Sequence, residues 1–161
     1  MAKDEIYCID SSSLMEWQAR YYPIEIFPGV EKRISELISE KRLITPALVQ
    51  EEIKAVGTTD LTQWLKNNKE IIIPTNEILK ETMSIQNQFS GLRDPKAEYD
   101  EADAYVIALA QIKKGIVLTQ ETSAAEKRNP KRTHYIPDVC RELGITCISF
   151  LGLMRREAWK F

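Results

Sequence analysis

The chain has 161 residues, of which 43% are hydrophobic and 29% charged, and its net charge is -2. This composition is typical of one globular domain with a substantial core. The net charge argues against a protein whose whole surface binds polyanions, but it allows a local basic patch. No apolar run reaches the length of a membrane span, and residues 1–5 lack the apolar core of a signal peptide. Three cysteines without CxxC spacing, Cys8, Cys140 and Cys147, favour reduced thiols, so we expect a cytoplasmic protein.

The N-terminal segment predicts a strand followed directly by a helix. The apolar run 6–9 favours a strand that ends at Asp10, and helical spacing of apolar residues begins after three serines. Asp10 is compatible with two roles. It can cap the helix, or it can bind a ligand, because open α/β sheets bind ligands at the carboxyl ends of their strands.

A helix, a short strand and a further helix follow. Amphipathic spacing predicts a helix over 30–41 and a strand over 43–44. Thr45 and Pro46 are typical of a helix start, with Thr45 as the cap and Pro46 as the first helical residue. We expect the apolar side of this helix to consist of Leu48, Val49, Ile53 and Val56.

The helix carries two adjacent acidic residues, Glu51 and Glu52, which can face in different directions. Glu52 lies one turn beyond Leu48 and Val49, so one glutamate can face inward while the other faces solvent. Two solvated glutamates are the alternative interpretation.

The remaining chain continues the alternation of strands and helices. Thr58 to Asp60 is typical of a helix start, with Leu61, Trp64 and Leu65 facing inward. Further strands are predicted over 71–74, 116–118 and 145–150, and further helices over 75–89, about 103–113, 136–144 and 151–160. This pattern predicts a single α/β domain over 1–161, with a mostly parallel sheet of about five strands and helices on both faces.

The helix after 103 has a carboxylate at the head of its apolar stripe. Asp103 lies one turn before Val106 and Ile107, within the stretch that begins at Tyr99. Burying a charge is unfavourable unless it has a partner. The simpler interpretation is that Asp100, Glu101 and Asp103 favour the positive end of the helix dipole.

Four carboxylates occupy corresponding places in the predicted fold. Asp10 and Glu121 follow strands, Asp103 begins a helix, and Glu52 lies on an early helix. Strand carboxyl ends and helix amino ends share one edge of such a sheet, so these groups can converge. Carboxylates that converge repel one another unless a cation neutralises them, and oxygen ligands suit Mg²⁺ or Mn²⁺. Such a site is suited to phosphodiester chemistry.

The four acidic segments, in their order, resemble the PIN domain family, which includes the VapC-type toxins of toxin–antitoxin pairs. The segments are Ile9–Ser12, Val49–Ile53, Ala102–Ala110 and Val117–Glu121. The tail, with Asn129–Arg132, Ile136–Cys140, Gly144-Ile145 and Cys147, resembles the PIN-like DUF4411 family. Each motif alone is weak, but their order is fairly specific.

The resemblance implies a three-layer α/β/α fold and a Mg²⁺- or Mn²⁺-dependent endoribonuclease. Asp10 and Asp103 would hold the ion, and Glu52 and Glu121 would complete its shell or orient the attacking water. Glu52 matches the family glutamate because Ile53 follows it, although Glu51 is a rival, and Glu121 departs from the aspartate of many members. Ser11, Ser12 and Thr119 would support these acids by hydrogen bonds. The products would carry a 5′ phosphate.

Partners are also implied. The basic loop predicts contacts to the RNA backbone through Lys127, Arg128, Lys131 and Arg132, although such a loop is often simply solvated. A toxin would bind an antitoxin, and Trp17, Tyr21, Tyr22 and Trp159 are candidates for exposed aromatic residues at an interface or a homodimer, although aromatic residues at helical spacing are more often part of the core.

Three alternatives remain. A catalytically silent PIN-like module that binds RNA or protein is disfavoured by the acidic set, which repels RNA without a metal ion. A haloacid-dehalogenase-like phosphatase needs a second aspartate where the chain has Ser12, and a Rossmann or P-loop protein needs glycine-rich motifs that are absent.

Overall fold

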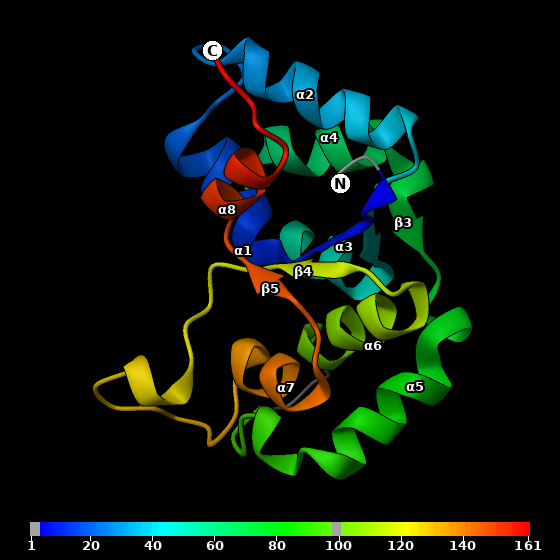
Figure 1. Ribbon diagram of the computed structural model, residues 1–161, viewed down its shortest axis with the longest axis vertical. Helices are drawn as coiled ribbons and strands as arrows, with labels where there is room; N and C mark the ends of the chain where they lie inside the picture. Colours follow the sequence, from blue (N-terminus) through cyan, green and yellow to red (C-terminus); the bar gives the residue numbers. More distant parts are fainter. Residues whose placement is uncertain (1–3, 98–100) are drawn as a thin grey trace.

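A five-stranded sheet in the order β3-β2-β1-β4-β5 forms the centre of the protein, and every pair of neighbouring strands is parallel. The computed structural model describes residues 4–97 and 101–161 (Figure 1). Its strands are β1 (Tyr7–Ile9), β2 (Leu43–Pro46), β3 (Ile72–Ile73), β4 (Ile116–Leu118) and β5 (Cys147–Ile148). The prediction of a largely parallel sheet of about five strands is confirmed.

Helices cover both faces of this sheet, as the prediction of three layers required. In Figure 1, α5, α6 and α7 lie below the sheet, and α2, α4 and α8 lie above it. Helix α6 crosses the lower face and contacts β1, β2 and β4. The helices are α1 (Ser11–Leu14), the π-helical η2 (Met15–Tyr21), α2 (Pro28–Ser39), α3 (Ala47–Val56), α4 (Thr59–Asn67), α5 (Thr75–Gln88), α6 (Asp103–Lys113), α7 (Ile136–Leu143) and α8 (Phe150–Arg156), and short 3₁₀ turns are η3 (Lys69–Ile71), η4 (Ser90–Leu92) and η5 (Ala124–Glu126).

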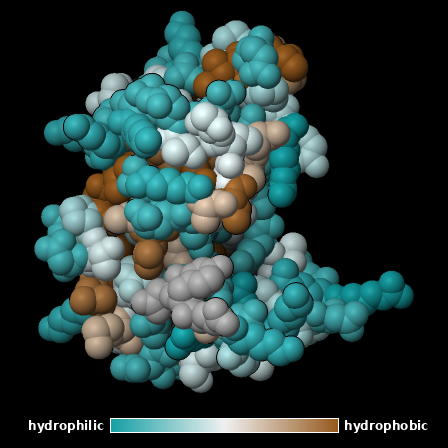
Figure 2. Space-filling model, turned by 180° about the vertical axis from the view of Figure 1, so that it is seen from behind, coloured by the Kyte–Doolittle hydropathy of each residue, from teal (hydrophilic) through white to brown (hydrophobic). Residues whose placement is uncertain are grey.

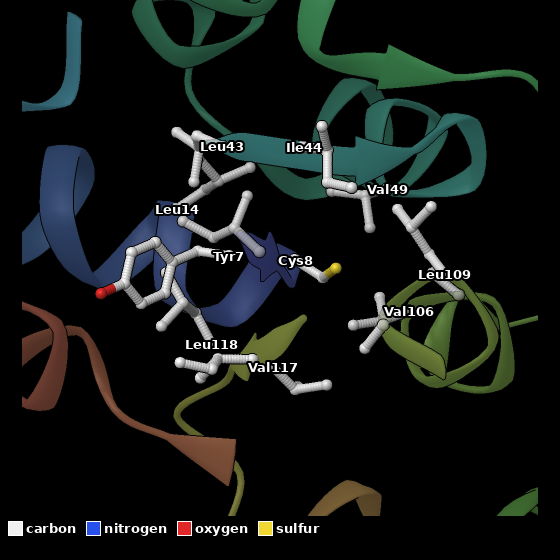
Figure 3. Close-up of a cluster of buried hydrophobic side chains, with 14 of the residues drawn as sticks. Tyr7, Cys8, Leu14, Leu43, Ile44, Val49, Val106, Leu109, Val117 and Leu118 are labelled. Atoms are coloured by element: carbon white, nitrogen blue, oxygen red, sulfur yellow. The ribbon is translucent and has the colours of Figure 1, made fainter. Parts of the chain in front are cut away.

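The core fills the space on both sides of β1. Successive strand residues point to opposite faces, so Cys8 points towards Val106 and Leu109 of α6, whereas Tyr7 points to the side of Leu14 (Figure 3). All five side chains are buried. Helix α6 is buried along its first eight residues, from Asp103 to Ala110, which makes it the central helix of the lower layer and fixes the position of its acidic first residue.

The prediction that α3 begins with Thr45 as its cap and Pro46 as its first residue is wrong. The Thr45 hydroxyl donates a hydrogen bond to the Ile9 carbonyl oxygen at 2.7 Å, and both Thr45 and Pro46 belong to β2. Strand pairing with β3 continues through Pro46, so Pro46 precedes the helix and Ala47 is its first residue. Val56, expected on the apolar side, is 72% exposed because it lies in the last turn of the helix.

One aromatic interface candidate is a core residue. Trp17 is fully buried and packs edge-to-face on Trp64, with the ring centroids 4.9 Å apart, so its prediction as an exposed aromatic residue is wrong. Tyr22 and Trp159 are partly buried against the core, and Tyr21 is exposed. The homodimer stays a prediction.

The surface seen in Figure 2 is mostly hydrophilic, with scattered apolar groups. The loop that follows β4, yellow in Figure 1, projects from the body of the molecule and is hydrophilic in Figure 2. Among residues 4–97 and 101–161, no helix has the length and apolar composition that crossing a membrane requires.

A buried ion-pair network stabilises the edge of the sheet at which the strands begin. Arg42 lies 2.6 Å from Glu157, both side chains are less than 10% exposed, and the Tyr7 hydroxyl also donates to Glu157. Glu157→Ala would remove a buried carboxylate that pairs with the buried Arg42 guanidinium, so we expect the free energy of unfolding to fall by about 2–4 kcal/mol in denaturant titrations. Glu40→Ala removes an exposed partner of Arg42 and should lower it by less than about 1 kcal/mol. Equal losses in both variants would contradict this assignment.

Candidate functional site

The predicted acidic residues meet at the point where the winding of the sheet reverses. Strands β1 and β4 are neighbours, and the chain leaves β1 towards α1 on one face but leaves β4 towards α7 on the other (Figure 1). Asp10 follows β1 directly, and its backbone N–H donates to the Leu118 carbonyl oxygen at 2.9 Å. In open parallel sheets, the crevice at such a reversal is the usual place of a ligand.

Asp10 is both the cap of α1 and a member of the site. Its carboxylate accepts hydrogen bonds from the Ser11 backbone N–H at 2.7 Å and from the Ser12 and Thr119 hydroxyls at 2.9 Å each. The side chain is buried. Burial, and then the negative charge of Asp103, raise the pKa of Asp10 above its ordinary value. Both roles proposed from the sequence therefore apply to this residue.

Glu52, not Glu51, faces this centre. The Ser11 hydroxyl donates to one oxygen of Glu52 at 2.9 Å, and the Ala102 backbone N–H donates to the other at 3.3 Å. Burial raises the pKa of Glu52 to about 7, against the hydrogen bond from Ser11, which lowers it. Glu51 is exposed and lies 3.6 Å from Lys54 on the outer side of α3.

Asp103 and Glu121 are joined by an arginine. The Arg132 guanidinium lies 2.6 Å from an oxygen of Asp103 and 3.2 Å from an oxygen of Glu121. The other oxygen of Glu121 accepts a hydrogen bond from the Ile136 backbone N–H at 3.1 Å, at the amino end of α7. Burial, and then the charge of Asp103, raise the pKa of Glu121.

These contacts form one ring of groups, which is closed by the hydrogen bond from the Ala102 backbone N–H, next to Asp103, to Glu52. Thr119 links Asp10 to Glu121, because its hydroxyl donates to Asp10 and accepts from the Glu121 backbone N–H at 3.1 Å. Ser11 links Asp10 to Glu52. The four predicted acids and their three predicted hydroxyl partners are thus brought together. Among residues 4–97 and 101–161, no three His, Cys, Asp or Glu side chains are arranged so that they could hold a metal ion.

The basic loop is built around Tyr135. The guanidinium of Arg132 and the ammonium of Lys127 lie 4.4 Å and 4.3 Å from the centre of its ring, as cation–π pairs do. Its hydroxyl accepts from the backbone N–H of Lys131 at 3.0 Å. Arg128 and Lys131 are exposed and Lys127 is half-buried, so the loop that supplies Arg132 to the acidic ring also carries three further cations.

A cavity of about 330 Å³ adjoins the ring. Its walls come from the end of α5, the turn η4 and the start of α6, and Asp103 and Glu101 belong to both the cavity and the acidic site. The other lining residues are Gln86, Asn87, Phe89, Ser90, Leu92, Arg93 and Ala104.

A family assignment follows from comparison with known sequences. The profile of the family described as "Domain of unknown function (DUF4411)" matches residues 7–161. The chain belongs to the DUF4411 family. This match spans all five strands and every residue of the acidic ring, and it confirms the resemblance seen in the tail.

Other comparisons add little to the DUF4411 assignment. No curated protein matches the chain. Among solved structures, the crystal structure of PAE2754 from Pyrobaculum aerophilum is similar, with 14% identity, a TM-score of 0.42, and coverage of 96% of this chain and 91% of that one.

Three residues of this DUF4411 site lie outside the predicted set. Glu101, which sequence reasoning assigned only to the helix dipole, is 3.6 Å from Arg132. Gln120 accepts from the Phe150 backbone N–H at 2.7 Å and from the Ser13 hydroxyl at 3.2 Å. Tyr135 anchors the loop, and its place directly before the Ile-Pro-Asp-Val-Cys segment was the available signal. Tyr99 and Asp100 lie outside the described residues.

Proposed function

We propose that this DUF4411 protein is a divalent-metal-dependent endoribonuclease that hydrolyses RNA phosphodiester bonds. The observation that carries the proposal is the ring of four carboxylates at the reversal point of the sheet. A purely structural cluster would pair its charges, but here burial first, and then the charges of the neighbouring carboxylates, raise the pKa of Asp10, Glu52 and Glu121. The ring thus holds more negative charge than Arg132 compensates.

The donor chemistry of the ring fits a hard divalent cation. All four acidic groups offer oxygen ligands, and neighbouring Ser and Thr hydroxyls hold Asp10 and Glu52 by hydrogen bonds, as outer ligands orient a coordination shell. Asp10 and Asp103 would hold the ion, with Glu121 completing the set and Glu52 facing the attacking water. When bound, Mg²⁺ or Mn²⁺ supplies positive charge beside the phosphate and makes water more acidic.

Glu52 is the best candidate for the proton acceptor. A pKa of about 7 leaves a substantial fraction ionised at neutral pH and able to accept a proton from water. The Ser11 hydroxyl fixes the direction of one Glu52 oxygen. As the water oxygen forms its bond to phosphorus, its proton passes to Glu52. The bond from phosphorus to the 3′ oxygen breaks, that oxygen takes a proton from solvent, and the product keeps a 5′ phosphate.

The surroundings of the ring support a nucleic-acid substrate. Lys127, Arg128 and Lys131 belong to the same loop as Arg132, which contacts the acids, and lysine and arginine bind phosphates without reading sequence. The neighbouring cavity offers space for a part of the substrate beside Asp103. The choice of RNA, and the role as the toxin of a toxin–antitoxin pair, rest on the resemblance to PIN domains.

Cleavage of single-stranded RNA and transfer RNA by the purified protein tests the proposal. We expect cutting with Mg²⁺ or Mn²⁺ and none with EDTA. The toxin role is tested separately by induced expression in cells, which should arrest growth for the wild type but not for Asp103→Asn. Absence of cutting with either ion, together with RNA binding, would favour the silent binding module instead.

A further inference from the structure

Arg132 provides the positive charge nearest to the acidic ring. Its guanidinium contacts Asp103 at 2.6 Å, Glu121 at 3.2 Å and Glu101 at 3.6 Å, and its side chain is only 12% exposed. The contact with Asp103 is short, those with Asp103 and Glu121 are charge-assisted hydrogen bonds, and all three lie in a poorly solvated place, unlike the surface ion pairs that contribute little.

Neutral groups hold the same guanidinium in place. It donates to the Leu92 carbonyl oxygen at 2.7 Å and lies over the ring of Tyr135 at 4.4 Å. The Tyr135 hydroxyl in turn accepts from the Arg132 backbone N–H at 3.4 Å. Arg132 therefore has anchors that do not depend on the carboxylates, and it can stay near the ring without binding them.

We infer that Arg132 is a tethered counter-cation that competes with the divalent ion for Asp103 and Glu121, an inference that rests on the proposed metal site. The carboxylate oxygens that face Arg132 are already engaged by its N–H groups. A divalent ion and a guanidinium that share these oxygens would repel each other strongly at such short range. Ion binding therefore requires the guanidinium to leave them.

The arrangement gives the metal-free protein a way to keep its acids together. Without a cation, carboxylates this close would repel or take up protons. Arg132 satisfies two of them, and once displaced its guanidinium, still held by Leu92 and Tyr135, has N–H groups available for a phosphate, which guanidinium groups are well suited to bind. The prediction of Arg132 as an RNA contact would then apply to the metal-bound state alone.

Calorimetric titration of Mn²⁺ into chelator-treated protein tests the inference without any assay of activity. We expect Arg132→Gln to bind Mn²⁺ about 10-fold more tightly than the wild type, or tighter still, because the competing charge is gone. Lys131→Gln removes one positive charge from the neighbouring, exposed position, and its affinity should stay within about threefold of the wild type, since exposed charges are screened.

Thermal unfolding gives a second measurement in case Arg132→Gln folds poorly. In EDTA the variant should melt below the wild type, because its acids have lost their counter-ion, and Mn²⁺ should raise its melting temperature more than that of the wild type. A variant that Mn²⁺ does not stabilise more than the wild type would overturn the inference. Arg132→Lys, which keeps the charge but loses the planar fork, should give an intermediate affinity.

The outcomes separate this inference from the proposed function. Wild-type protein that binds Mn²⁺, with equal or weaker binding by Arg132→Gln, overturns the role of Arg132 and leaves the metal site standing. No binding by either protein overturns the metal site and the inference together. Binding by Arg132→Gln alone would support both.

Discussion

Asp103→Asn is expected to lower the RNA-cleavage rate by about 10²–10⁴-fold, equivalent to about 3–5 kcal/mol of lost transition-state stabilisation. Asp103 lies among the other acids: burial first, and then the charge of Asp103, raise the pKa of Asp10 and Glu121, and both act on Glu52 as well. Asparagine keeps the shape of the side chain and removes that charge, so it weakens the attraction for a divalent ion more than it disturbs packing. Initial rates on single-stranded RNA with Mg²⁺ or Mn²⁺ measure the effect.

Asp60→Asn is the matched control for this variant. Asp60 also lies in the first turn of a helix, α4, but it is exposed. It reports what the loss of a helix-dipole interaction does by itself, about 0.3–1 kcal/mol of stability, and its cleavage rate should match the wild type. If Asp103→Asn, folded by circular dichroism, cleaved RNA as fast as the wild type, the assignment of the acidic ring as the active site would be wrong.

The metal-free protein is expected to lose stability as the pH rises from about 5.5 to 8. Burial raises the pKa of Glu52 from 4.5 to about 7 and raises those of Asp10 and Glu121 as well. The folded state therefore holds more protons than the unfolded state in this range, and the stabilisation present below the unfolded pKa disappears as the pH rises through the folded pKa. For Glu52 alone we expect about 1–2 kcal/mol after allowance for solvent screening, a few degrees in melting temperature.

Two comparisons test the origin of this pH dependence. Glu52→Gln cannot ionise, so its melting temperature should fall less between pH 5.5 and 8, whereas Glu51→Gln, altered at the adjacent exposed position, should behave as the wild type. Saturating Mn²⁺ should also flatten the dependence, because a bound cation favours the ionised carboxylates. A metal-free wild type that became more stable towards pH 8 would contradict the raised pKa values.

Much of the fold was predictable from local pattern. The continuous apolar run Ile116–Leu118 is β4 in full, because a strand buried on both faces tolerates no polar residue. Thr58 caps α4 by accepting from the Leu61 backbone N–H, and Gly144 ends α7 with a positive φ of 73°. These features depend on a few neighbouring residues, so the sequence carries them by itself.

Element boundaries that depend on distant partners were not predictable. Thr45 and Pro46 have the local character of a helix start, but a hydrogen bond to Ile9 and pairing with β3 keep them in β2. Trp17 has an aromatic side chain that either an interface or a core would accept, and packing against Trp64 decides for the core.

The candidate site, like the fold, was predictable from the sequence only in part. The convergence of Asp10, Asp103 and Glu121 could be expected from the sequence, because acids placed after parallel strands or at helix starts lie at one edge of the sheet, and the resemblance to the family added Glu52. The resemblance to the family already favoured Glu52 over Glu51, and the rotation of α3 about its axis decides between them. The ion pairs of Arg132 with Asp103 and Glu121 depend on the conformation of an irregular loop, which has no periodic pattern from which its contacts could be predicted. A charge pair between residues 29 positions apart has no local signature, so only the tertiary structure could assign the basic residue that faces the acids.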